Sequence, residues 1–353
     1  MDYLAAPLVL LLLLLLLQGL GGFPGMIKRS GCNEMNGFCS CVQEFSLQCV
    51  DMGIDSLSFL RENLQNDSFA LVSLSYNNIS EILNGDLPFY LFTELVVLHM
   101  DHNAVSEIQP QAFEELPALR NINLSFNRIS NIHSDTFRNN TKLRELGLSQ
   151  NYLTSVDFVR KVPSLQYLFL DGNKISILPN KTFSNSPSSD LYLINLRNNS
   201  LQTIEPKAFY GLTKLQFLLL EGNSLTVLHP GTFRFTPNLR YLHADRNRLA
   251  NLSLSHNTIN LREGFFSQNN ISVLTNDIFS GSSVVQLEEL NLENNSISIV
   301  RHRAFQRLQR LWKLNLSGNN ISLIYPDTFQ NTTCLSILDV SNNLIDNLDF
   351  KLL

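Results

Sequence analysis

Aromatic side chains between residues 167 and 265 are the residues of this sequence best suited to bind another molecule. They recur beside leucines, at positions that the repeat described below places on the open face of a sheet. Exposed rings that gather in this way commonly form the centre of a protein-binding surface. The rings are those of Tyr167, Phe169, Tyr192, Phe217, Tyr241, His243 and Phe265; the aliphatic Leu219 belongs to the same set, and Asp171, Asp245 and Arg246 lie at its rim. A β-strand preference of aromatic residues, with no ligand, is the alternative explanation.

Residues for catalysis or metal binding are sparse. The sequence contains no G-x-S-x-G, no H-E-x-x-H and no glycine-rich phosphate loop. His99 and His102 flank Asp101 and could hold a metal ion, but a solvated polar surface is the simpler explanation. We therefore predict a protein that is not an enzyme and that uses no metal or other cofactor.

Four of the five cysteines lie in one short segment, at Cys32, Cys39, Cys41 and Cys49. In an oxidising compartment such a cluster indicates two disulfides, and four cysteines allow three pairings. A zinc site is the alternative, but no histidine is near and no paired C-x-x-C occurs. Cys334 is left over, as an inert thiol or as one half of an intermolecular disulfide.

The N-terminus predicts export. Leu8 to Leu17 are ten consecutive aliphatic residues, followed by small residues up to Gly22. This pattern is typical of a signal peptide over residues 1–22, and a short uncleaved anchor is the alternative. No other apolar stretch is long enough to span a bilayer, so we expect a secreted or extracellular chain without a transmembrane segment.

Asparagine sequons (N-x-S/T) predict a glycoprotein. Two of them, at Asn123 and Asn315, fall between strand leucines, where an attached glycan would obstruct the open face of the sheet. The full set is Asn66, Asn78, Asn123, Asn139, Asn180, Asn198, Asn251, Asn270, Asn294, Asn315, Asn320 and Asn331.

An internal repeat provides the elements that position these residues. The pattern L-x-x-L-x-L-x-x-N-x-L recurs twelve times, with its asparagine at 77, 103, 127, 151, 173, 199, 223, 247, 269, 295, 319 and 343. Its L-x-L part alternates with period two, which predicts a short strand with leucines facing inward. Each asparagine amide should satisfy backbone groups where the chain turns. We therefore expect a solenoid whose strands form one parallel sheet, with the variable positions on its open face.

A second period is superimposed on the first. The intervals between repeat asparagines run 26, 24, 24 and 22 and then start again, so the pattern returns every 96 residues. A phenylalanine recurs five residues after an aliphatic residue in most repeats, which predicts a buried spine. Its members are Phe113, Phe137, Phe183, Phe209, Phe233, Phe279, Phe305 and Phe329.

The repeat and the cysteine cluster resemble extracellular leucine-rich-repeat proteins with a cysteine-rich N-terminal cap, a group that includes Slit, chaoptin, small leucine-rich proteoglycans and Toll-like receptor ectodomains. The resemblance covers residues 32–350. It implies the disulfides Cys32–Cys41 and Cys39–Cys49. It also implies a curved horseshoe, with the parallel sheet on the concave face and an irregular or 3-10 convex side.

The domain organisation expected from this resemblance is a leader (1–22), a short segment (23–31), a disulfide cap (32–49) and about twelve repeats (50–353). The last repeat stops partway and the family's C-terminal cysteine cap is absent. We hypothesise that the chain is a fragment or a truncated isoform, or that another chain covers its C-terminal end. A homo- or heterodimer could then form through this end or through Cys334.

The expected function is recognition of an extracellular protein ligand or co-subunit by a secreted or cell-surface protein, as in adhesion or reception. An extracellular matrix scaffold and a non-catalytic subunit of a secreted enzyme are the alternatives. A net charge of −5 without a basic stripe argues against nucleic acid as the partner.

Overall fold

The computed structural model describes residues 39–346, apart from 43–44, 65–68, 88–91, 184–188, 253, 255–259, 277 and 280–285. The leader, Cys32, the sequon at Asn66 and the last residues, 347–353, lie outside the described part of the chain. Within that part, no helix is both long enough and apolar enough to cross a bilayer.

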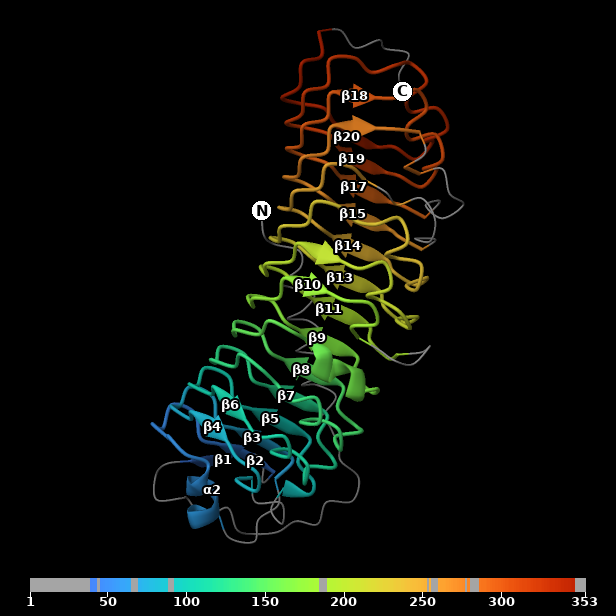
Figure 1. Ribbon diagram of the computed structural model, residues 1–353. Coiled ribbons are helices and arrows are strands. Elements are labelled where there is room, and N and C mark those ends of the chain that lie inside the picture. Colours follow the sequence, from blue (N-terminus) through green and yellow to red (C-terminus); the bar gives the residue numbers. More distant parts are fainter. Residues whose placement is uncertain are drawn as a thin grey trace.

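One 14-stranded sheet runs through the whole array (Figure 1). Its first two strands, β1 (Ser40–Val42) and β2 (Ser46–Gln48), are antiparallel, and the later pairs are parallel. Twelve strands follow, each just before one repeat asparagine: β3 (Leu71–Ser73), β5 (Val97–His99), β7 (Asn121–Asn123), β8 (Glu145–Gly147), β9 (Tyr167–Phe169), β11 (Leu193–Asn195), β13 (Phe217–Leu219), β14 (Tyr241–His243), β15 (Glu263–Phe265), β17 (Glu289–Asn291), β19 (Lys313–Asn315) and β20 (Ile337–Asp339). The predicted parallel-sheet solenoid is confirmed.

Each strand of the large sheet is three residues long, and its central residue faces inward. In β9, Leu168 is fully buried, while Tyr167 and Phe169 on either side of it are half-exposed. Neighbouring strands pair with their inward residues in register, as Leu146 does with Leu168. The inward residues, mostly leucines, thus form a row across the sheet, and a single repeat could not bury its own inward residue without its neighbours.

The repeat asparagines join successive turns, as predicted. Asn127 donates from Nδ2 to the carbonyl oxygens of Met100 in the preceding turn and Leu124 in its own, at 2.9 and 3.0 Å. Its Oδ1 accepts the backbone N–H of Val105 at 2.9 Å. Asn151 repeats these bonds one turn later, with Leu124 and Ile129. The buried amide therefore satisfies backbone groups that would otherwise lack partners.

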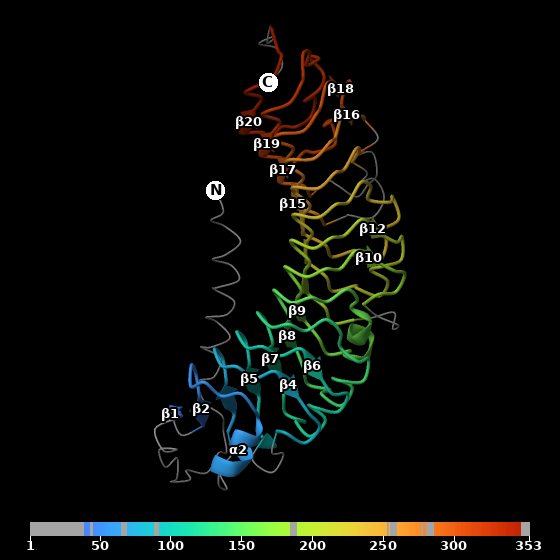
Figure 2. The ribbon, with the colours of Figure 1, turned by 60° about the vertical axis from the view of Figure 1, so that its left-hand side comes forward.

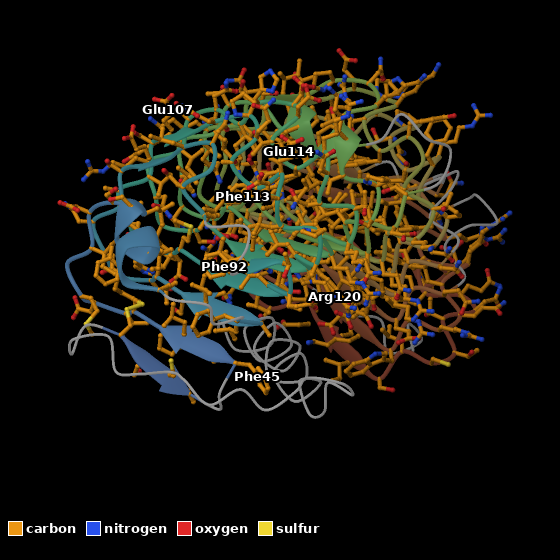
Figure 3. All side chains as sticks on the ribbon, turned by 90° about the horizontal axis from the view of Figure 1, so that it is seen from below. Phe45, Phe92, Glu107, Phe113, Glu114 and Arg120 are labelled. Atoms are coloured by element: carbon orange, nitrogen blue, oxygen red, sulfur yellow. A yellow bond between two sulfur atoms is a disulfide. The ribbon has the colours of Figure 1, made fainter. Side chains whose placement is uncertain are left out.

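The phenylalanine spine is also confirmed, and all eight of its members are buried. Phe113 and Phe137 stack with their ring centroids 5.4 Å apart, and Phe305 and Phe329 stack at 5.6 Å. Figure 3, a view from below, shows Phe92 and Phe113 inside the coil and Glu107 at its surface. The spine thus fills the space between the sheet and the outer side.

The outer side carries three two-stranded sheets within the described residues. They pair β4 (Glu81–Ile82) with β6 (Glu107–Ile108), β10 (Ile177–Leu178) with β12 (Thr203–Ile204), and β16 (Val273–Leu274) with β18 (Ile299–Val300). The first strands of these three sheets, β4, β10 and β16, begin at residues 81, 177 and 273. Each therefore begins 96 residues after the preceding one. The larger period predicted from the asparagine intervals is therefore a structural period as well.

Helix is almost absent from the described residues. α2 (Ser58–Asn63) follows the cap, and the 3-10 helix η1 (Asp157–Lys161) lies in the short repeat between Asn151 and Asn173. Figure 2 shows the large sheet along the inner side of a bent array and the small sheets along its outer side. We call the exposed side of the large sheet the concave face.

The cap contains the predicted Cys39–Cys49 disulfide. Cys41 is disulfide-bonded as well, and Cys32, its predicted partner, lies outside the described residues. Cys334 is a free, exposed thiol.

A candidate binding face on the sheet

Two rows of side chains from neighbouring strands build the centre of the concave face. In the first row, Tyr167, Leu193, Phe217 and Tyr241 are consecutive register partners. In the second row, Phe169, Asn195, Leu219, His243 and Phe265 pair in the same way. Side chains of equal strand position lie about 4.8 Å apart, so their rings can touch.

The rings form an almost continuous chain of contacts. Tyr192 contacts Tyr167 and Phe217, with centroids 5.8 and 5.4 Å away. Phe217 stacks parallel to Tyr241 at 4.3 Å, and His243 packs against Phe265 at 4.5 Å. We call these residues, with Phe169, the aromatic patch. Each of its side chains is half-buried and so still reachable from solvent.

Two of the predicted residues sit differently from the others. Tyr192 lies one residue before β11, so Leu193 is the register partner of Tyr167. The Tyr192 ring contacts those of Tyr167 and Phe217 from its place just before the strand. Leu219 is in the second row but only 5% exposed. Leu219 therefore supports the patch and offers a ligand little surface.

His243 is held neutral within the patch. Burial, and after it the nearby Arg197, lowers the pKa of His243 to about 4. The Nη2 of Arg197 lies 3.4 Å from Nδ1 of His243, which fits a ring that accepts at this nitrogen. Glu221 sits between two cations, with Arg197 Nε at 3.3 Å and Arg246 Nη1 at 3.7 Å. Glu221 therefore already neutralises part of the positive charge of Arg197 and Arg246.

The rim carboxylates are tied down by neutral donors. Asp171 accepts from Ser149 Oγ at 2.6 Å and from Asn195 Nδ2 at 2.9 Å. Asp245 accepts from both the hydroxyl and the backbone N–H of Ser267. Burial raises the pKa of Asp245, against the effect of the Ser267 hydrogen bonds. Both carboxylates therefore fix the edge of the face.

A second aromatic group, at the N-terminal end of the array, was missed by the sequence analysis. The ring of His102 stacks between Tyr76 and Phe126, with both centroid distances 4.2 Å. Tyr76 and Phe126 are exposed, and all three residues have positive φ. Each directly precedes a repeat asparagine, at a position where Gly172, Gly222 and Gly318 also have positive φ. An aromatic residue directly before three successive repeat asparagines is the sequence pattern that could have predicted this stack.

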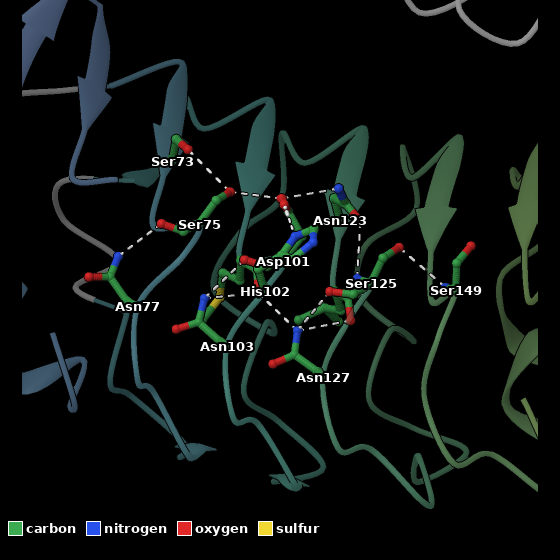
Figure 4. A network of polar contacts seen from close by, with 12 residues as sticks. Ser73, Ser75, Asn77, Asp101, His102, Asn103, Asn123, Ser125, Asn127 and Ser149 are labelled. Atoms are coloured by element: carbon green, nitrogen blue, oxygen red, sulfur yellow. Dashed lines mark hydrogen bonds and ion pairs between the residues drawn. The ribbon is translucent and has the colours of Figure 1, made fainter. Parts of the chain in front are cut away.

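A polar network lies beside this stack (Figure 4). Asp101 accepts from Ser75 Oγ at 2.7 Å and Asn123 Nδ2 at 3.1 Å, and it pairs with Nδ1 of His102 at 3.0 Å. The described residues contain no cluster of three side chains suited to hold a metal ion. In this arrangement Asp101 orients His102 and joins three turns.

The sequon asparagines are not part of the aromatic patch. Among those in the described residues, only Asn123 and Asn315 are half-buried, and the others are exposed. On the concave face these two stand on β7 and β19, on either side of the aromatic patch. Their amides donate to Asp101 and Glu293, respectively.

Comparison with known protein families gives one consistent result. The family model described as "Leucine rich repeat" matches residues 93–153, 189–249, 265–321 and 285–345. A second model, "Leucine Rich repeats (2 copies)", matches residues 141–181. Together these matches cover more than half of the chain.

A human relative, "Leucine-rich repeats and immunoglobulin-like domains protein 2", is 29% identical over 160 residues, which are 45% of this chain and 12% of that protein. The chain thus spans about an eighth of the relative's length.

Solved structures share the fold. A Leptospira interrogans LRR protein superposes with a TM-score of 0.71 at 22% identity, over 85% of this chain and 72% of that one. A chain of the octameric complex of Latrophilin 3, Unc5D and FLRT2 superposes with a TM-score of 0.71 at 22% identity, over 90% of this chain and 98% of that one. A chain of the Drosophila Toll–Spatzle complex superposes with a TM-score of 0.72 at 24% identity, over 82% of this chain and 40% of that one.

Proposed function

The chain belongs to the leucine-rich-repeat family, and from that premise we propose that it is an extracellular recognition protein that binds a protein partner on its concave face. The observation that carries the proposal is the aromatic patch. Its rings touch one another across successive strands on a rigid sheet, and they remain half-exposed. Large rings held in place lose little conformational freedom on binding, which makes them effective anchors.

The solved relatives support a protein as the partner. Toll is found in a complex with Spatzle, and FLRT2 in a complex with Unc5D and Latrophilin 3. Catalysis is not part of the proposal, because the patch offers rings and already paired charges, with no nucleophile beside a base.

A binding screen tests the proposal. The chain would be expressed with its leader, purified from medium and screened against an array of cell-surface and secreted ectodomains. The variant Phe169→Ser/Tyr241→Ser/Phe265→Ser should lose each partner found, by at least a hundredfold in affinity if the three rings act as anchors.

A matched control keeps this test specific. Val227, Ile299 and Leu323 are exposed apolar residues outside the large sheet, 50%, 42% and 51% exposed. Their triple replacement by serine should leave binding unchanged. Retained binding in the patch variant, with normal secretion and melting temperature, would refute the site.

Export, glycosylation and dimerisation are further parts of the proposal. Mass spectrometry of the secreted chain should show a new N-terminus near residue 23 and glycans on exposed sequons such as Asn139. Non-reducing electrophoresis of wild type and Cys334→Ser tests a disulfide dimer, because Cys334 is an exposed thiol. A monomer in both samples would exclude that disulfide.

A further inference from the structure

The first row of the aromatic patch ends in a carboxylate on both sides. Across the sheet the register runs from Glu145 on β8 to Tyr167, and at the other side from Tyr241 to Glu263 on β15. We propose that the patch binds an extended segment of a protein partner that has a cationic side chain at each end of an apolar stretch, with the cations meeting Glu145 and Glu263. This rests on the proposed function, because it specifies the partner's chemistry at the same patch.

Glu145, at one end of the first row, is a half-buried carboxylate. It accepts a hydrogen bond from Asn121 Nδ2 at 2.9 Å and has no ion pair among the described residues. Burial raises its pKa, and only that hydrogen bond opposes the rise. Its neighbour Arg144 is exposed at the start of the strand and forms no ion pair with it in the described structure. A partner's ammonium or guanidinium would compensate this charge.

Glu263 at the other end is in a similar position, for a different reason. The next carboxylates have their own cations, since Glu289 pairs with Lys313 at 2.6 Å and Glu288 with Arg262 at 3.6 Å. Glu263 has no ion pair within the described part of the chain. Burial, and then Glu289 and Glu288, raises its pKa, with Lys313 opposing.

The distance between the two carboxylates sets the spacing in the partner. Five strand steps separate β8 from β15, which is about 24 Å at the usual strand spacing. An extended chain advances about 3.4 Å per residue, so the two cations of the partner are about seven positions apart in its sequence. An α-helix would need about sixteen residues for the same distance.

Between the two carboxylates, no residue of either row begins a sequon. In the second row, Asn123 on β7 and Asn315 on β19 begin sequons. Asn195 and Asn291 occupy the same strand position without being sequons, because Arg197 and Glu293 replace the required Ser or Thr. A peptide can therefore lie along the row of carboxylates and rings between the two concave-face sequons.

Selection from a displayed library of random 20-residue peptides tests the inference. Wild type should enrich peptides with two Lys or Arg residues six to eight positions apart and apolar residues between. Enriched peptides without such a pair, or with pairs about sixteen apart, would overturn it.

Charge variants then assign the contacts. Glu145→Gln and Glu263→Gln should each weaken an enriched peptide about two- to fivefold in fluorescence anisotropy, and reduce the salt dependence of its binding. Glu289→Gln is the matched control, because Lys313 already neutralises that carboxylate, and it should change little. Equal effects of all three variants would overturn the inference.

The aromatic variant Phe217→Ser/Tyr241→Ser separates this inference from the proposed function. If wild type enriches apolar peptides without cations and the aromatic variant loses them, the binding face stands and the charge requirement falls. If the aromatic variant enriches the same peptides as wild type, the proposed face itself is wrong.

Discussion

His243 brings a titratable ring into an apolar surface, and its surroundings determine how acid affects the fold. In the unfolded chain a histidine takes up a proton near pH 6.5, whereas in the folded chain the pKa of His243 is about 4. Between these values the unfolded chain binds more protons, so falling pH favours unfolding. The contribution of His243 to stability is therefore fully present above pH 6.5 and is lost as the pH falls toward 4.

Replacement by phenylalanine tests this, because Phe169 and Phe265 occupy the same strand position. Wild type should lose about 2–3 kcal/mol more than His243→Phe between pH 7 and pH 4. Urea unfolding at both pH values measures the difference. An identical pH dependence in the two proteins would contradict the assignment.

Single residues also show how far the sequence could predict the site. The inward leucines and the asparagine bonds follow from a local motif, and all were predictable. The approach of Arg197 to His243 was not, because the two residues are 46 positions apart. Arg197 lies in the turn after β11 and His243 on β14, and β13 separates these two strands. The burial of Leu219 also depends on neighbouring strands. Whether the patch binds a ligand stays a prediction, because that depends on a partner.

At the scale of the element, β15 differs from its neighbours in how it fills the core. Gly264 takes the inward place that Leu242 and Leu290 hold on the adjoining strands, and the ring of Phe266 occupies the space. A Cβ on Gly264 would lie 3.0 Å from Cε2 of Phe266. The pair thus replaces the usual two leucines.

This exchange predicts a compensating double variant. Gly264→Leu should destabilise the protein by about 1–3 kcal/mol, because the added side chain meets the Phe266 ring. Gly264→Leu/Phe266→Leu should recover most of that loss, since it restores the arrangement of the other strands. Thermal melting of both variants measures the effect, and a double variant no better than the single one would refute this account.

Strand β11 offers a way to close the face with a glycan. Arg197→Thr turns Asn195-Leu196-Arg197 into a sequon at the centre of the aromatic patch. The glycosylated variant should lose a partner of the patch by more than tenfold, because the glycan covers the rings. Arg197→Ala removes the same cation without creating a sequon, so it should retain binding. The added mass confirms occupancy, and binding by the occupied variant would place the partner elsewhere.

The 96-residue period belongs to the scale of the whole molecule. It was predictable because each turn contacts only its neighbours, so local spacing determines the global pattern. Deleting residues 174–269 removes one full period and joins Asn173 to Asn270, which keeps the order of long and short repeats. We expect this variant to unfold in one cooperative transition by circular dichroism.

A smaller deletion provides the contrast. Removing residues 174–247 leaves a longer chain but places two short repeats in succession. Length alone would make it the more stable of the two variants, whereas the period predicts a lower melting temperature for it. The order of the two melting temperatures therefore distinguishes the two explanations.

The outer sheets β4–β6, β10–β12 and β16–β18 give the array uneven mechanics. Each links two adjacent turns by hydrogen bonds on the outer side, in addition to those of the large sheet. The described solenoid therefore contains three stiffened pairs of turns, and the turns between these pairs are more compliant. One stiffened pair, joined by β10–β12, carries Tyr167, Phe169 and Tyr192, at one end of the aromatic patch. A ligand that bends the array on binding would bend it on either side of that pair, and these three rings would move as one body.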